Sequence, residues 1–446
     1  MNNQVFPVVV VGAGPIGLAA AAQLVERGLE ALVFEAGDAV SAAVREWHHV
    51  RLFSRWSGLI DPAARRLLEK SDWQEPDPDG YPTGLEWATQ YLQPLADALG
   101  TVVRLNTRVV GVARRGRDRV VDAGRDNEPL VVRTVSADGV EHRVVARAVI
   151  DASGTWGSPS PVGADGLPAI GERAAADKIS YRVPDLTDAD NVVRYAGRQV
   201  AVLGSGHSAL TALVAFAGFA QTHPGTRVRW VLRRGAVGNA FGGGESDQLA
   251  ARGALGQRAQ VAVDAGHVEV VTGFRTSDIE RAGDRLVLVS DDGRRLDAVD
   301  EVVAVTGFRP DLSWLSEVRL DLDARLQAPV ALAPLIDPNV HSCGTVYPHG
   351  VKELTHSEAG VFLVGMKSYG RAPTFLALTG YEQVRSVVAA IAGDHQAAER
   401  VDLILPETGV CGGAGLFDEP VSDAGAGGCC GVPAPVELTL TASPRD

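Results

Sequence analysis

Residues 8–35, VVVVGAGPIGLAAAAQLVERGLEALVFE, constrain the fold more than any other stretch of the chain. An apolar run at 8–11 leads straight into a glycine-rich turn, an alanine-rich helical stretch continues to Arg27, and a second apolar run ends on Glu35. A buried strand, a glycine turn, a helix and another buried strand, in this order, are typical of a parallel α/β sheet. The sequence therefore predicts an α/β unit at residues 8–35.

The residue types in this first glycine turn are those that bind a dinucleotide. Its three glycines permit a tight turn, a close approach of the backbone to a pyrophosphate, and close packing of the helix on the strand. The N-terminus of the helix offers free N–H groups to the phosphates, and the acid after the second strand accepts hydrogen bonds from a ribose. The residues expected to contact the dinucleotide are Gly12, Ala13, Gly14, Pro15, Gly17 and Glu35.

A second unit of the same kind begins near residue 199. An apolar run at 199–203 precedes the turn GSGHSA, a helical stretch follows to Ala220, and a strand at 228–232 ends on two arginines. Arginine at that place favours the 2′-phosphate of NADPH over NADH. His207 either steers a pyrophosphate or simply begins the helix. The expected contact residues of this second glycine turn are Gly204, Ser205, Gly206, His207, Ser208, Ala209, Arg233 and Arg234.

Two further segments, RAVIDASG at 147–154 and DEVVAVTGFRP at 300–310, each carry a buried strand into a turn, with Gly154 and Gly307 in the turns. One such segment follows each glycine turn, so we expect two nucleotides to face each other. Alternating apolar residues at 102–112 and 131–150 predict a small antiparallel excursion between the two units.

Composition excludes several classes of partner. The net charge of -13 and the pI near 5.3 argue against nucleic acid and against an anionic membrane surface. No apolar stretch reaches the roughly 18 residues of a membrane span, and the apolar N-terminal run lacks the basic flank of a signal peptide. Few cysteines in a chain of 446 residues fit a reducing compartment. We therefore expect a cytoplasmic protein with a small-molecule substrate.

Together these motifs resemble those of the two-dinucleotide flavoprotein oxidoreductases, in particular NADPH-type flavin monooxygenases and their relatives. The resemblance covers roughly residues 5–395 and rests on GAGPIG with Glu35, GSGHSA with the arginine pair, and the segments DASG and AVTGFRPD. It implies FAD at the first glycine turn and NADPH at the second. The chain also looks like flavoproteins associated with arsenic-resistance gene clusters.

Departures from the family patterns bear on the substrate. Disulfide reductases of the superfamily carry a CxxC or CxxxxC pair beside the flavin, and this chain has none. The FxGxxxHxxxF-like signature of flavin monooxygenases keeps its glycine at Gly171 but has Ala175 at the histidine position. The GD pair that many relatives place near the flavin is Gly365-Met366 here.

The predicted fold is α/β, with two Rossmann-like three-layer domains for FAD and NADPH, the second inserted in the first, and small antiparallel excursions. The predicted boundaries give an FAD-binding first part, an NADPH-binding domain, a return of the FAD-binding domain and a flexible glycine- and cysteine-containing tail, at 1–195, 196–305, 306–400 and 401–446.

The predicted function is that of an enzyme, an FAD-containing and NADPH-dependent oxidoreductase of monooxygenase type that oxidises a soft nucleophile such as a trivalent arsenical. Two alternatives stay open: an NADPH-dependent metal, metalloid or thiol reductase that uses the C-terminal cysteines, and a non-enzymatic flavin redox sensor. Candidate catalytic residues are Cys343, His49 and Arg51. His49 and Arg51 belong to a segment, 41–56, that either lines the flavin or substrate cavity or packs as an ordinary loop and helix.

Three cysteines lie in the glycine-rich tail, and two of them are adjacent. Because a vicinal disulfide closes a strained ring, such a pair suits a soft-ion clamp or an exchanging dithiol. Mercuric reductases end in a similar pair, and flexible tri-cysteine sites suit trivalent arsenic. The residues of this candidate metalloid site are Cys411, Cys429 and Cys430, and the alternative is a chance cluster in a disordered tail.

Overall fold

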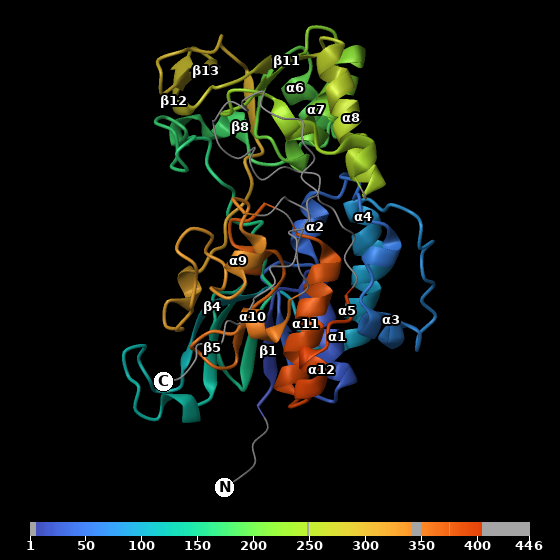
Figure 1. The fold of residues 1–446 in the computed structure, drawn as a ribbon, viewed down its shortest axis with the longest axis vertical. Coiled ribbons are helices and arrows are strands. Elements are labelled where there is room, and N and C mark those ends of the chain that lie inside the picture. Colours follow the sequence, from blue (N-terminus) through green and yellow to red (C-terminus); the bar gives the residue numbers. More distant parts are fainter. Residues whose placement is uncertain (1–5, 248, 341–348, 374, 404–446) are drawn as a thin grey trace, which may run out of the picture.

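The computed structural model of the chain describes residues 6–247, 249–340, 349–373 and 375–403. These residues form two lobes that lie one above the other in Figure 1. The lower lobe, here called the first domain, holds the N-terminal strand and the C-terminal helices of the described chain. The upper lobe, the second domain, holds the middle of the chain.

The first domain is built on a five-stranded parallel sheet of order β15-β7-β1-β2-β3. The central strand β1 pairs in register with both of its neighbours, Val8 with Ala31 on one side and with Ala148 on the other. The strands are β1 (Val8–Val11), β2 (Ala31–Phe34), β3 (Val103–Arg104), β7 (Ala148–Asp151) and β15 (Val361–Leu363).

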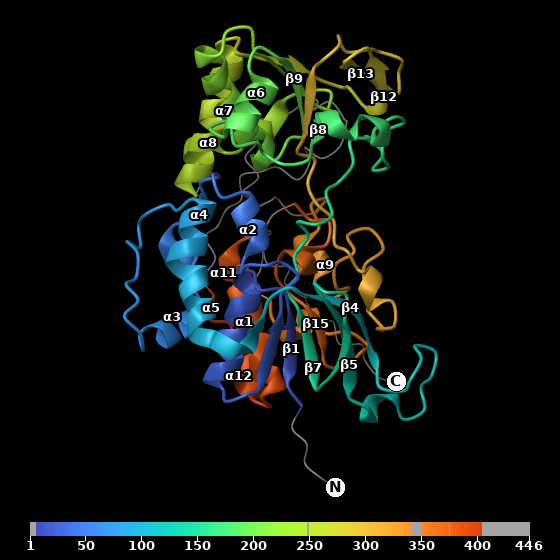
Figure 2. The same cartoon turned by 180° about the vertical axis from the view of Figure 1, so that it is seen from behind.

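Each face of this sheet is covered by a different layer. Val8 and Val10 pack into a core with the helices, whereas Val9 and Val11 pack against the antiparallel sheet β4-β5-β6. All four valines are buried, and burying one such side chain contributes about 1.5–3 kcal/mol. The antiparallel strands are β4 (Thr107–Arg114), β5 (Leu130–Ser136) and β6 (Glu141–Ala146). Figure 2 shows this sheet on the side opposite the helices.

The helical layer is centred on α1, which packs against α3, α5 and α11. Proline at the first position of α1 and Gly28 just beyond its end, at φ +68°, are favourable residues at a helix start and a helix end. The helices of the first domain are α1 (Pro15–Glu26), α2 (Ala42–Glu46), α3 (Pro62–Leu68), α4 (Gly84–Trp87), α5 (Gln93–Leu99), α9 (Ala333–Ile336), α10 (Val351–Leu354), α11 (Ala377–Ile391) and α12 (His395–Glu399).

The second domain repeats this arrangement on a parallel sheet of order β11-β10-β9-β14-β8. Val200 and Val202 of β9 face α7 and α8, and Ala201 and Leu203 face the hairpin β12-β13. Its elements are β8 (Ile179–Ser180), α6 (Ala189–Tyr195), β9 (Gln199–Leu203), α7 (His207–Thr222), β10 (Arg227–Val231), α8 (Ala250–Asp264), β11 (Val268–Val271), β12 (Thr276–Ala282), β13 (Arg285–Ser290) and β14 (Glu301–Ala304).

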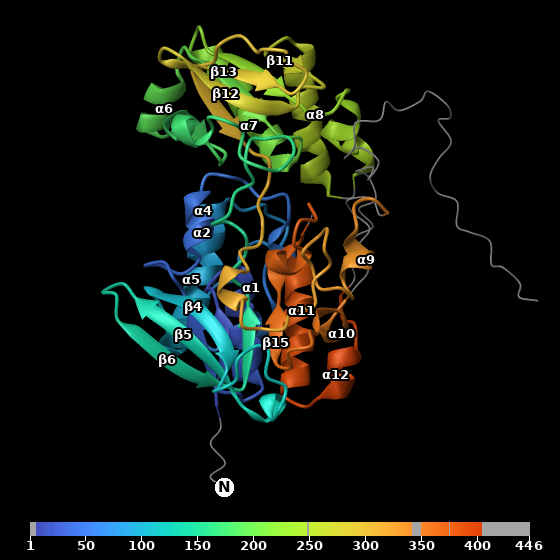
Figure 3. The same cartoon turned by 90° about the vertical axis from the view of Figure 1, so that its left-hand side faces the viewer.

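The chain leaves the first domain after β7, builds the second domain and returns after β14 (Figure 3). The predicted α/β class, with three-layer domains and one domain inserted in the other, is confirmed. The predicted boundary at 195 needs a correction, because β8 pairs with β14 and Tyr195 packs in the core of the second domain. The chain before residue 195 therefore already belongs to the second sheet from β8 onward.

Two connections join the domains and contact each other. The backbone N–H of Ser160 donates to the carbonyl of Gly307 at 2.8 Å, and the rings of Trp156 and Phe308 stack with centroids 4.9 Å apart. Gly154 and Gly307 both have positive φ, at +67° and +98°, which suits glycine in these turns. Within the described residues, no helix combines the length and the apolar character needed to cross a membrane.

Candidate cofactor and active site

The first glycine turn joins the end of β1 to the start of α1. Gly12 lies at φ +95°, and a Cβ on Gly17 would lie 1.9 Å from the carbonyl oxygen of Gly12, so both positions need glycine for the turn itself. Gly14 differs from them, because a Cβ there would meet no protein atom within 4 Å. The helix α1 begins directly after Gly14 without a side-chain cap. The N-terminal amides of α1 and the open space at Gly14 thus lie at the same point of the fold.

Glu35 stabilises this turn through two hydrogen bonds. One carboxylate oxygen accepts from the backbone N–H of Ala13 at 2.8 Å, and the other accepts from the N–H of Gly37 at 2.8 Å. The side chain is half-buried at the end of β2. A carboxylate has about four acceptor sites, so these two hydrogen bonds leave capacity for a ribose hydroxyl. The structure therefore gives Glu35 a structural role that the sequence does not reveal.

A buried ion pair lies behind the turn. The ammonium of Lys367, 1% exposed, lies 2.7 Å from Asp151 Oδ2, and it donates to Ser153 Oγ at 3.0 Å. Asp151 Oδ1 accepts from the N–H and the hydroxyl of Ser153, and a Cβ on Gly12 would lie 3.0 Å from Ser153 Cα. Sequence reasoning missed Lys367 and Asp151. The one available signal was an acid at the end of a buried strand, in DASG.

The second glycine turn has the same division of roles. A Cβ on Gly204 would lie 2.3 Å from the carbonyl oxygen of Val305, whereas a Cβ on Gly206 would meet no protein atom within 4 Å. Gly206 and Ser208 are exposed, Ala209 is buried against the sheet, and α7 begins at His207 without a side-chain cap. Both glycine turns therefore combine a packed glycine with an open one at the start of a helix.

The arginine pair follows β10, next to this turn. Arg233 is exposed, and its guanidinium donates to the carbonyl of Ala164 at 3.3 Å. Arg234 is half-buried, and its carbonyl accepts from the N–H of Gly273. Two cationic side chains at the end of β10 are the chemistry expected for an anionic group bound beside the turn.

The segment 41–56, which contains α2, connects the two turns. Its first residue, Ser41, donates its backbone N–H to the carbonyl of Ala13 at 2.9 Å, which anchors the segment on the first turn. Farther along, the ring of Phe53 contacts that of His207, with centroids 5.3 Å apart. The first domain therefore reaches the start of α7, and His207 has a packing role besides beginning the helix.

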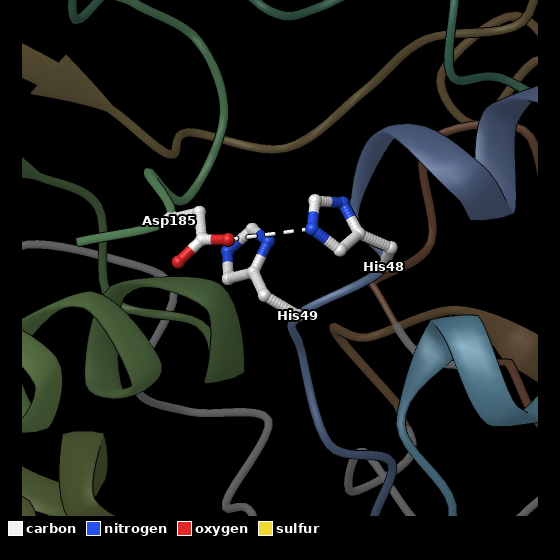
Figure 4. A group of neighbouring side chains, drawn as sticks. All are labelled: His48, His49 and Asp185. Atoms are coloured by element: carbon white, nitrogen blue, oxygen red, sulfur yellow. Dashed lines mark ion pairs between the residues drawn. The ribbon is translucent and has the colours of Figure 1, made fainter. Parts of the chain in front are cut away.

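Of the three candidate catalytic residues, His49 and Arg51 lie in this segment. His49 is half-buried beside His48 and Asp185, as Figure 4 shows. Burial lowers the pKa of the His49 imidazole, and the nearby Asp185 carboxylate opposes this shift. Arg51 is exposed; it donates to the carbonyl of Tyr81 in the loop before α4 and lies 3.7 Å from Oε2 of Glu86 within α4.

The remaining predicted positions lie outside the described residues. Cys343 falls in the gap at 341–348, and Cys411, Cys429 and Cys430 fall after residue 403. The candidate metalloid site therefore stays a prediction.

Solved structures of similar fold come from two functional classes. The bacillithiol disulfide reductase Bdr (YpdA) from Bacillus cereus has a TM-score of 0.63 at 19% identity, covering 87% of this chain and 99% of that chain. A flavin-containing monooxygenase from Stenotrophomonas maltophilia has a TM-score of 0.53 at 23% identity, covering 87% and 98%. At these identities the likeness is one of fold.

Sequence comparisons identify one relative and one family. Indole-3-pyruvate monooxygenase YUCCA1 of Oryza sativa subsp. japonica is 29% identical over 204 residues, which are 45% of this chain and 43% of that relative's length. The family described as pyridine nucleotide-disulphide oxidoreductase matches residues 9–331. Because this match takes in both glycine turns and more than half of the chain, the protein belongs to the pyridine nucleotide-disulphide oxidoreductase family.

Proposed function

We propose that the chain binds FAD at the first glycine turn and NADPH at the second, and uses them to oxidise a small soft nucleophile such as a trivalent arsenical with oxygen. The observation that carries the cofactor assignment is the open space at Gly14 and Gly206, next to glycines that are packed tight. Backbone N–H groups at the start of a helix, not covered by a side chain, can donate hydrogen bonds to a pyrophosphate.

In this proposal the FAD contacts come from the first turn with Glu35 and Gly154, and the NADPH contacts come from the second turn with Arg233, Arg234 and Gly307. The residues of the turns themselves are Gly12, Ala13, Gly14, Pro15 and Gly17 in the first, and Gly204, Ser205, Gly206, His207, Ser208 and Ala209 in the second. FAD, when bound, takes a hydride from NADPH and passes electrons to the next acceptor.

The buried ion pair supports the first turn in this proposal. Lys367 holds Ser153 in place through its hydrogen bond, and Ser153 Cα packs against Gly12. Lys367 therefore acts on the cofactor through the turn, as a positioning residue.

The described residues contain no cysteine and so place no thiol pair beside either turn, which favours oxygen as the acceptor. All four cysteines follow residue 342, so none lies in the glycine turns or in the two domain connections. Two relatives of monooxygenase activity point in the same direction. The likeness to a disulfide reductase and the adjacent cysteines of the tail keep an NADPH-dependent thiol or metalloid reductase as the second candidate.

Oxygen consumption separates the candidates. In the proposed reaction one oxygen atom goes to the substrate, and the other leaves as water with two electrons from NADPH and two protons. Air-saturated assays with a trivalent arsenical should therefore consume one O₂ and one NADPH per product. A reductase would instead oxidise NADPH without oxygen when given a disulfide or metal ion, and the Cys429→Ser, Cys430→Ser double variant would lose that activity. If neither a trivalent arsenical in air nor a disulfide or metal ion without oxygen stimulates NADPH oxidation, the non-enzymatic redox sensor is the remaining hypothesis.

A further inference from the structure

Two histidines of the first domain and one carboxylate of the second domain converge on a cavity between the domains. The cavity has a volume of about 340 Å³ and is lined by Glu46 at the end of α2, by His48 and His49 just after it, and by the segment from β8 to α6. Ligand atoms of His48, His49 and Asp185 all lie within 4.8 Å of one another. Figure 4 shows the side chains of His48 and His49, neighbours in one segment, converging with that of Asp185 from the second domain.

His48 uses one ring nitrogen, Nδ1, for a backbone contact, and its other ring nitrogen, Nε2, lies next to the carboxylate of Asp185. His48 Nδ1 lies 3.2 Å from the carbonyl oxygen of Arg45. A carbonyl only accepts, so Nδ1 carries the proton, and in the neutral ring Nε2 presents a lone pair. Nε2 lies 3.3 Å from Asp185 Oδ2, which is also only an acceptor when ionised. Two acceptors in this position need either a second proton on the ring or a cation between them.

The other two groups are also poised as ligands. Both ring nitrogens of His49 are buried and neither makes a hydrogen bond of good geometry among the described residues, although the backbone of Val183 and Pro184 lies close enough to interact with the ring. Asp185 uses Oδ1 to accept from the N–H and hydroxyl of Thr187, which leaves Oδ2 for the histidines. An imidazole that donates one N–H to a carbonyl and offers the other nitrogen is the usual arrangement of a metal-bound histidine.

We propose that His48, His49 and Asp185 bind a divalent cation of the Zn²⁺ class, which links the two domains. Two imidazoles and one carboxylate suit zinc and its neighbours in the first transition row. Ligand atoms about 2.0–2.1 Å from a tetrahedral Zn²⁺ lie roughly 3.3–3.4 Å apart, and the separation of His48 Nε2 and Asp185 Oδ2 already matches this value. His49 closes the set by moving about 1.5 Å or less, and the cavity leaves the fourth position open to water.

The experiment first removes the cysteines, which could bind the same metal ions. The full-length chain with all four cysteines changed to serine, purified without a histidine tag, is titrated with Zn²⁺ by calorimetry and with Co²⁺ by visible absorption. One Zn²⁺ per chain and the intense d–d bands of tetrahedral Co²⁺ are expected. His49→Gln and Asp185→Asn should each weaken binding at least tenfold.

Asp188→Asn is the matched control. Asp188 lines the same cavity, but its carboxylate caps α6 by accepting from the N–H groups of Asp190 and Asn191, a role that asparagine retains. This variant should bind Zn²⁺ as the parent does, and Zn²⁺ should raise the melting temperature of both but not that of His49→Gln. A cysteine-free chain without a zinc site, or equal affinities in Asp185→Asn and Asp188→Asn, would mean that the cluster is only an ion pair of protonated His48. None of these readouts depends on FAD, NADPH or a substrate.

Discussion

Valine at position 14 should separate cofactor binding from folding. Gly14 has φ −80° and ψ −175°, an extended conformation that valine adopts readily, and a Cβ there meets no protein atom within 4 Å. Valine is a poorer helix N-cap than glycine by about 1 kcal/mol or less. The apoprotein should therefore melt within about 4 °C of the wild type.

FAD binding should respond much more strongly. The valine side chain would fill the space from which a pyrophosphate approaches the amides of α1. A hydrogen bond to a charged group contributes about 1.5–3 kcal/mol, so losing one contact weakens FAD binding roughly tenfold to a hundredfold. Fluorescence titration of the apoprotein with FAD measures the dissociation constant, and a thermal melt of the same sample measures stability.

Gly17→Ala provides the contrast. Its Cβ would lie 1.9 Å from the carbonyl oxygen of Gly12, so the turn must shift, and such overpacking costs about 1–3 kcal/mol or more. This variant should lose both stability and FAD. Full FAD content in Gly14→Val, or a loss of apoprotein stability as large as that of Gly17→Ala, would refute the assignment of the open space to FAD.

Substitutions at two further buried sites, the Lys367–Asp151 pair and Asp61, test buried charges. Lys367→Met leaves the Asp151 carboxylate buried without its partner and should lower the free energy of unfolding in urea by about 3–5 kcal/mol. Adding Asp151→Asn to this variant should recover much of the loss. If it recovers nothing, the ammonium matters mainly through its hydrogen bond to Ser153. Burial raises the pKa of the Asp61 carboxyl to about 6 in the folded chain, from about 3.8 when unfolded. Its contribution to stability is therefore complete below pH 3.8 and is lost as the pH rises through about 6. Asp61→Asn, which keeps the α3 cap, should gain up to about 3 kcal/mol relative to wild type as the pH rises from 4 to 7. A pH-independent difference in unfolding free energy would show that folding does not shift the pKa of Asp61.

The parts of the fold that follow from sequence are those set by neighbouring residues. Each glycine turn is encoded within a few dozen residues, because strand, turn, helix and strand follow one another and pair in parallel. The packed and open glycines of each turn then differ only in what lies beside them.

Features that depend on long-range packing were missed. Helix α8 has glycines at 253 and 256, which argue against a helix, yet Cβ atoms there would lie 2.0 Å from the carbonyl oxygen of Gly244 and 1.8 Å from that of Phe241. These glycines therefore serve close packing. The two-residue strand β8 is too short to be read from sequence and is set by its pairing with β14.

In the candidate sites, too, local features can be predicted from sequence, whereas contacts between distant segments cannot. Neither Lys367 with Asp151 nor His48 with Asp185 could be paired from sequence, because each pair joins segments from distant parts of the chain that only the folded chain brings together. Charges at the ends of buried strands and adjacent histidines in a loop were visible, but their partners were not.

Anaerobic reduction of the bound flavin tests the central claim most directly. The purified protein should hold about one FAD per chain, and NADPH should bleach its visible absorption. If Arg233 and Arg234 hold the 2′-phosphate through charge-assisted contacts of about 1.5–3 kcal/mol each, NADPH should act at least tenfold more efficiently than NADH, and the Arg233→Ala, Arg234→Ala variant should lose this preference. A flavin that NADPH does not reduce, or that NADH reduces equally well in the wild type, would contradict the account.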